Sequence, residues 1–343
     1  IIGLQGNPQR FAQPLRHRET PVERQRDHAR AESDQCGAQV LVASAVAQDK
    51  ANTDAATPST TNKEDAVEKE YQKLLDDDDE AHAEMDEWIK QTSQQLTNVF
   101  SASQITLKLK IEQRLEQVKK DYEAFLKKYP DHTKARIAYA SFLSDIGKEK
   151  ESFKQLEIAK QKDPQNPAVW NNLANYYAHN DSTTNGFYHY EKAIELNPNE
   201  PVYYKNFATS IYMFRDESMD YYKLSEEQVI EKAAGLYKKA LQLNPKDFHI
   251  ACDLAQTYYG YKLPQVPAKE LRQNKQIQQL ADKAIDAWKV AEKLARDNIE
   301  KQGINIHIAR WQITSGKLTE AKKTLASVNL DMYQTIKESL DKK

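Results

Sequence analysis

Apolar residues recur at helical spacing along most of the chain, and several of these patterns end at a proline. Pro130, Pro164 and Pro198 stand 34 residues apart, and Pro245 repeats the signal after an insertion. The stretches that end at Pro198 and Pro245 are alike, reading Tyr-Glu-Lys-Ala-Ile-Glu-Leu-Asn-Pro and Tyr-Lys-Lys-Ala-Leu-Gln-Leu-Asn-Pro. A fixed period of this length is typical of stacked helical hairpins. The pattern therefore predicts an all-α array of helix-turn-helix repeats.

Two insertions interrupt the period, and both fall between the two helices of a hairpin. In the first, Ala233 stands about 13 residues later than the repeat would place it. Ser225 and Gln228 have the spacing of a capping box there, which predicts that the following helix begins early. At the end of the chain Met332, Ile336 and Leu340 share one face of a final helix. Such a helix covers the apolar face that the last hairpin would otherwise expose.

The N-terminal part differs in composition from the rest. Residues 1–49 contain no lysine, and they lack helical or strand periodicity, so we predict a disordered leader. Within it, Ala45-Val46-Ala47 matches the small-residue site that precedes signal cleavage, which predicts a periplasmic or secreted protein. A cytoplasmic protein with an apolar stretch in its leader is the alternative. No run is long and apolar enough for an integral membrane segment.

These signals divide the chain into segments. The segments that we predict are a leader at 1–62, an acidic helix at 63–98, a repeat array at 99–329 with insertions near 213–230 and 261–280, and a capping helix at 330–343. The acidic helix contains the run Asp76-Asp77-Asp78-Asp79-Glu80. This run is a patch for a cation or a basic partner, or, as we favour, a solvated helix face.

Candidate chemistry is sparse. No Gly-rich phosphate loop, Gly-x-Ser-x-Gly or His-Glu-x-x-His occurs. Glu80, His82 and Glu84 are metal-ligand types, but a spacing of two places them on different helix faces. The 49 basic and 51 acidic residues nearly balance, which argues against nucleic acid as a partner. We predict no enzyme, no cofactor and no metal.

The repeat motifs resemble the tetratricopeptide repeat (TPR), whose pattern is Trp-x2-Leu-Gly-x2-Tyr, then Ala-x3-Phe and Pro. Its first half is matched by Trp170, Leu173, Ala174 and Tyr177, with alanine in place of glycine, and its second by Tyr237, Ala240 and Pro245. The resemblance covers about 99–330. It implies a right-handed superhelical solenoid in which small residues, such as Ala174, let the two helices of a hairpin approach closely.

The resemblance also implies a binding groove, because the first helix of each TPR hairpin lines the concave side. Asparagine suits such a groove, since its amide both donates to and accepts from an extended peptide main chain. An ordinary hydrated groove is the alternative. The positions between the packing residues, which we take as the candidate site, are Asn171, Asn172, Asn175, Lys205, Asn206, Thr209, Asp253, Gln256 and Arg310.

Some TPR proteins grip a terminal carboxylate with lysine, asparagine and arginine from three successive hairpins. Asn175 and Asn206 match the two asparagines of that clamp, but its cationic places hold Asn171, His249 and Asp253. We therefore predict that free acidic C-termini do not bind by this mechanism.

The function that we predict is a non-catalytic scaffold for a protein or peptide held in the groove. The alternative is a structural subunit of a larger assembly, which makes contact through its N-terminal helices, edge insertions or convex face. A third possibility is an unrecognised helical enzyme. Tyrosines outside the packing pattern are candidates for an edge surface near the first insertion. They are Tyr203, Tyr212, Tyr221, Tyr222, Tyr259 and Tyr261.

Overall fold

The computed structural model of the protein describes residues 61–95, 102–180 and 182–341, and throughout these ranges the regular secondary structure is helical, without strands. The all-α prediction is confirmed. The chain divides into two compact units, with the boundary between Tyr176 and Tyr177. The predicted leader and its Ala45-Val46-Ala47 site lie outside the described residues, and the division into segments stays a prediction.

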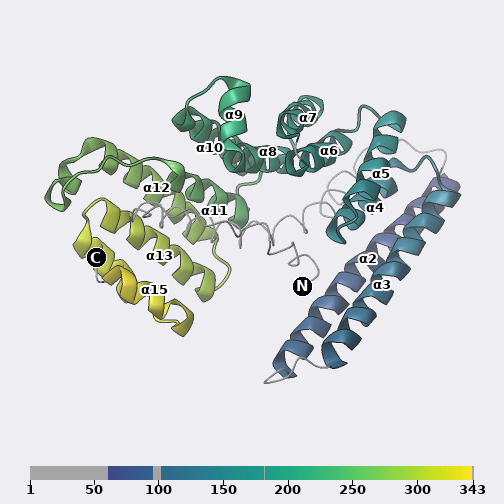
Figure 1. The fold of residues 1–343 in the computed structure, drawn as a ribbon, viewed down its shortest axis with the longest axis horizontal. Helices are drawn as coiled ribbons and strands as arrows, with labels where there is room; N and C mark the ends of the chain where they lie inside the picture. Colours follow the sequence, from purple (N-terminus) through teal and green to yellow (C-terminus); the bar gives the residue numbers. More distant parts are fainter. Residues whose placement is uncertain (1–60, 96–101, 181, 342–343) are drawn as a thin grey trace, which may run out of the picture. The chain divides into compact units, whose positions relative to one another are not determined.

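Unit 1 is built from consecutive antiparallel helices, of which the first two form a long hairpin (Figure 1). Its helices are α2 (Thr61–Gln95), α3 (Ala102–Lys128), α4 (Thr133–Asp145) and α5 (Glu149–Lys162), and α6 (Pro167–His179) begins in this unit. α2 packs on α3, α3 on α4 and α4 on α5. Val118 and Tyr122 on α3 are fully buried, and the Tyr122 ring stacks on that of Tyr139 with centroids 5.2 Å apart.

The acidic run of α2 is solvated only in part, because two of its members bind residues of α3. Arg114 donates to the Asp77 carboxylate at 2.8 Å and to Glu84 at 2.7 Å. Asp78 is buried and accepts a 2.7 Å hydrogen bond from the Tyr122 hydroxyl. The helical spacing of these acids turns them toward the neighbouring helix, so that part of the negative charge holds the hairpin together.

Unit 2 continues the alternation of first and second helices. Its helices are α7 (Thr183–Leu196), α8 (Pro201–Met213), α9 (Arg215–Tyr222), α10 (Glu226–Leu243), α11 (Phe248–Thr257), α12 (Lys275–Leu294), α13 (Asn298–Thr314), α14 (Leu318–Ala326) and α15 (Asp331–Asp341). α8 packs on α10, α11 on α12 and α13 on α14. The small residues Ala208, Ala255 and Ala309 are fully buried at these crossings, as predicted.

Both insertions lie between the two helices of a hairpin. The first contains α9, and α10 then begins at Glu226 behind the predicted capping box, in which Gln228 N donates to the Ser225 hydroxyl at 3.3 Å. The second contains the short 3-10 helices η3 (Tyr258–Gly260) and η4 (Ala268–Gln273). It is fastened to the next hairpin, because Arg272 Nε donates to Gly316 O at 2.7 Å.

Two inter-helix turns use a glycine with positive φ, a conformation that other residues adopt only with strain. Gly147 joins α4 to α5 with a φ of 74°, and a Cβ added there would have no neighbour within 4 Å. Gly316 joins α13 to α14 with a φ of 72°. A Cβ at Gly316 would lie 3.1 Å from Arg272 Cγ, because the second insertion covers this turn.

The last helix, α15, packs on α13 and α14, but its packing face differs from the predicted one. Met332 is 64% exposed, whereas Tyr333, Ile336 and Leu340 contact the core. A cause lies on α13, where Gly303 leaves room for Tyr333. A Cβ on that glycine would lie 2.9 Å from the Tyr333 hydroxyl. The prediction of Met332 as a packing residue was wrong.

Candidate functional site

The predicted groove residues lie on first helices of the hairpins, but they divide between the two units. Unit 1 holds Asn171, Asn172 and Asn175, all on α6. Asn171 is only 2% exposed, so its amide is not presented to a ligand. Asn172 is half-buried and donates to Ala168 O on its own helix at 2.9 Å, while Asn175 is also half-buried. Asn175 therefore remains the best-placed asparagine of this group.

In unit 2 the helix α8 presents fewer of its predicted residues than the sequence indicates. Asn206 is buried at 8% exposure, and only Lys205 and Thr209 are half-buried. The Thr209 hydroxyl is 3.0 Å from Lys205 O and 2.7 Å from the hydroxyl of Tyr237, which comes from α10. Lys205 is thus the residue of α8 with a charge to offer a ligand.

The next first helix, α11, places an acid near that lysine. Asp253 and Gln256 are both half-buried. Neighbouring side chains remove water from the Asp253 carboxyl, and this burial raises its pKa to about 6, while the positive charge of Lys205 acts in the opposite direction. At neutral pH Asp253 is therefore mostly ionised, and it faces a cation from the preceding hairpin.

Arg310 on α13 borders an aromatic cluster that sequence reasoning missed. The ring of His307, one turn earlier, lies flat on Trp288 with centroids 4.1 Å apart, and its Nδ1 is 3.0 Å from the Tyr259 hydroxyl. Burial, followed by the charge of Arg310, lowers the pKa of His307 to about 3, so the imidazole is neutral at physiological pH. The spacing of three between His307 and Arg310 was the available signal, since it places both on one helix face.

The tyrosines predicted to form an edge surface do not stay together. Tyr203 is buried, and Tyr259 and Tyr261 pack against the α11–α12 core. Tyr221 and Tyr222, on α9, remain near the surface.

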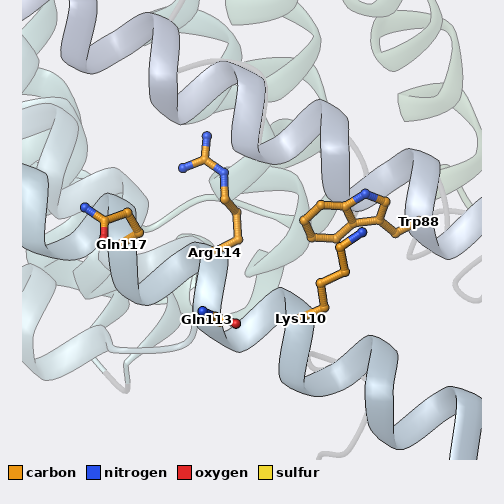
Figure 2. A pocket seen from close by; sticks show the side chains of 5 residues that line it. All are labelled: Trp88, Lys110, Gln113, Arg114 and Gln117. Carbon is orange, nitrogen blue, oxygen red and sulfur yellow. The ribbon is translucent and has the colours of Figure 1, made fainter.

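An open hollow of about 280 Å³ lies along the α2–α3 hairpin of unit 1, and Figure 2 shows the five side chains that line it. The Lys110 amine stands 3.7 Å from the centre of the Trp88 ring. Arg114 is held by Asp77 and Glu84. Because these cations are already engaged, we place no binding site in this hollow.

In the part of the chain that the structure describes, no group of three or more His, Cys, Asp or Glu residues could hold a metal ion. Nor does any helix in the described ranges have the length and apolar character to cross a membrane.

No family model matches the chain, and no curated protein matches it. Among solved structures, it is similar to PilW, a type IV pilus biogenesis factor, with 13% identity over 69% of this chain and 95% of the other and a TM-score of 0.48. Pseudomonas aeruginosa pilF is 17% identical over 69% and 91%, with a TM-score of 0.47. YrrB, a TPR protein with an unusual peptide-binding site, is 11% identical over 65% and 98%, with a TM-score of 0.45.

These likenesses are distant, with every quoted TM-score below 0.5. The hairpins themselves define the class. Second helices end before Pro164, Pro198 and Pro245, and the small residues of the repeat are buried where the paired helices cross. The described residues thus have a TPR-like fold of helical hairpins.

Proposed function

We propose that the protein is a non-catalytic interaction scaffold that holds an extended peptide along the first helices of unit 2. The observation that carries this proposal is the placement of Lys205 and Asp253. They lie on successive first helices, α8 and α11, close enough for the lysine charge to act on the Asp253 carboxyl. Both stay partly exposed while Ala208 and Ala255, on the same helices, are fully buried.

This arrangement suits a peptide main chain with mixed polar side groups. Lys205 supplies donors, Asp253 supplies acceptors, and the Gln256 amide supplies both. Arg310 extends the polar surface on α13. A free acidic C-terminus is a poor ligand, because the ionised Asp253 repels a carboxylate. The near balance of acidic and basic residues likewise disfavours nucleic acid.

The test begins with selection of ligands from a displayed random-peptide library, with the full chain as bait. Selected peptides are then titrated by fluorescence anisotropy against the full chain and against the double variant Lys205→Ala, Gln256→Ala. With about 1 kcal/mol lost for each hydrogen-bonding side chain, the double variant should bind roughly tenfold or more weakly.

The matched control is Lys239→Ala with Gln242→Ala, which removes the same residue types from exposed positions of the second helix α10. It should leave affinity unchanged. Equal affinity of all proteins for every selected peptide would refute the groove proposal. Contact would then lie on the N-terminal helices, the insertions or the convex face, as in a structural subunit.

Export to the periplasm or the medium stays a proposal based on Ala45-Val46-Ala47. N-terminal sequencing of the protein purified from its source tests it. A mature chain that begins at Gln48 would support cleavage after this motif, and a chain that retains the leader would contradict it.

A further inference from the structure

An aromatic and acidic surface lies outside the proposed groove, where α9 of the first insertion packs on α7. Two large aromatic side chains of this region are exposed, Tyr188 at 52% and Tyr221 at 39%. Acidic side chains surround them. We call this the Tyr–acid surface, and its members are Tyr188, Glu191, Glu217, Asp220, Tyr221 and Tyr222.

Helical spacing puts the members on common faces. Tyr188 and Glu191 are three residues apart on α7, and Glu217, Asp220 and Tyr221 follow the same rule on α9. The two helices meet there, because the ring of Tyr221 lies 5.5 Å from that of buried Phe187. The Tyr222 hydroxyl donates to Glu191 at 2.7 Å. This surface is therefore one continuous patch of unit 2.

The rings of this patch already hold one cation. Lys232 Nζ, from α10, lies 4.1 Å from the centre of the Tyr222 ring and 5.9 Å from that of Phe207. An ammonium over a tyrosine face is attracted by the negative charge of the ring face. Tyr188 and Tyr221 expose aromatic surface of the same kind to solvent.

The carboxylates beside those exposed rings are available to a partner. Within the described part of the chain, neither Glu217 nor Asp220 forms an ion pair. Both side chains are exposed. Exposed carboxylates beside exposed aromatic rings suit the guanidinium of arginine. This cation is planar, so it can stack on an aromatic ring while it pairs with a carboxylate.

We propose that the Tyr–acid surface binds an arginine-bearing segment of a partner protein. The guanidinium stacks on Tyr188 or Tyr221 while Glu217, Asp220 and Glu191 pair with the positive charges. A second copy of this chain is a poor occupant, because a two-fold contact would bring the same acids face to face. Nucleic acid is excluded by the repulsion between its phosphates and these carboxylates.

The test uses three short fluorescent Gly/Ser peptides that carry spaced arginines, lysines or glutamates, titrated by anisotropy against the full chain. We expect saturable binding of the arginine peptide, weaker binding of the lysine peptide and none of the glutamate peptide. Higher salt should weaken the binding, since the charges are exposed.

Variants locate the binding. Tyr188→Ala with Tyr221→Ala should weaken the arginine peptide about tenfold, since each stacked cation contributes modestly at an exposed site. Glu217→Gln with Asp220→Asn should weaken it about fivefold, as expected of exposed pairs. The control Met332→Ala with Glu338→Gln removes an exposed apolar side chain and an exposed acid from α15, and it should change nothing.

Circular dichroism checks that each variant keeps its helices, and Tyr188→Ala alone serves if the double variant unfolds. The proposal is overturned if the arginine peptide does not bind, if it binds no better than the lysine peptide, or if the tyrosine variants bind as tightly as the unchanged chain. The groove variant Lys205→Ala, Gln256→Ala should bind the arginine peptide normally, which separates this surface from the proposed function.

Discussion

The pair formed by buried Asp78 and half-buried His82 should make the α2–α3 hairpin less stable in alkaline solution. His82 Nδ1 lies 2.9 Å from the main-chain oxygen of Asp78 and 3.2 Å from its Oδ1. The side-chain interaction with Asp78 raises the pKa of His82 to about 9, burial opposes it, and the charge of Asp145 on α4 adds to it. The positive charge of the imidazolium therefore compensates the negative charge of the Asp78 carboxylate, which is almost completely buried.

The direction of the pH dependence follows from the pKa values of His82 in the unfolded and in the folded chain. The ordinary value is 6.5, so between 6.5 and about 9 the folded chain binds more protons than the unfolded one. The stabilisation is complete below 6.5 and is lost as pH rises through about 9. A shift of this size corresponds to about 3.4 kcal/mol if fully expressed. Because the His82 side chain is 34% exposed, solvent screening leaves about 1–2 kcal/mol.

The assay is hydrogen–deuterium exchange of α2 and α3 in the full chain, at about pH 6 and about pH 9.5, corrected for the intrinsic exchange rates. The opening free energy of the unchanged chain should fall by about 1–2 kcal/mol more than that of His82→Ala. His249→Ala, which removes an exposed histidine from α11, is the control and should behave as the unchanged chain. If the unchanged chain and His82→Ala lose equal stability across this window, the reasoning is refuted.

Three further predictions concern stability, each measured by urea unfolding of the full chain. Ser225→Ala removes the cap of α10 and should cost about 1 kcal/mol; no change would mean that the capping box is replaced by water. Trp288→Ala empties a fully buried site and should cost about 3–5 kcal/mol, whereas a loss below about 1 kcal/mol would contradict its place in the core. Gly147→Ala should cost about 1 kcal/mol from backbone strain alone, and Gly316→Ala should cost more because its new Cβ meets the second insertion; equal costs would refute that contact.

The repeat architecture was readable from sequence because proline, alanine and capping residues act locally. Pro198 and Pro245 end their patterns wherever the hairpin is placed, and Ser225 with Gln228 caps a helix through its own backbone. These features need no knowledge of distant neighbours. The positions of the hairpin helices were therefore predictable, including the early start of α10.

The candidate site was only partly predictable, because exposure depends on what the neighbouring hairpins cover. Asn171 occupies the same repeat position as Lys205, and Asn172 the same position as Asn206. In each pair one residue is buried (Asn171, Asn206) and the other is half-buried. The interhelical role of Asp78 was hidden for a similar reason, since Tyr122 is distant in sequence. The place of Tyr188 in the Tyr–acid surface was not predictable, because it depends on the packing of α9 on α7.

The first insertion gives this protein a way to change its outer surface without changing its repeats. α8 and α10 pack against each other although the chain between them forms the additional helix α9. Ser218, fully buried, anchors α9 by donating to Ile211 O at 3.3 Å, while its other residues face solvent or pack on α7, α8 and α10. A new sequence for that short helix, with the anchor kept, would give the same framework a different partner. The insertion is thus a natural position at which to graft a recognition helix.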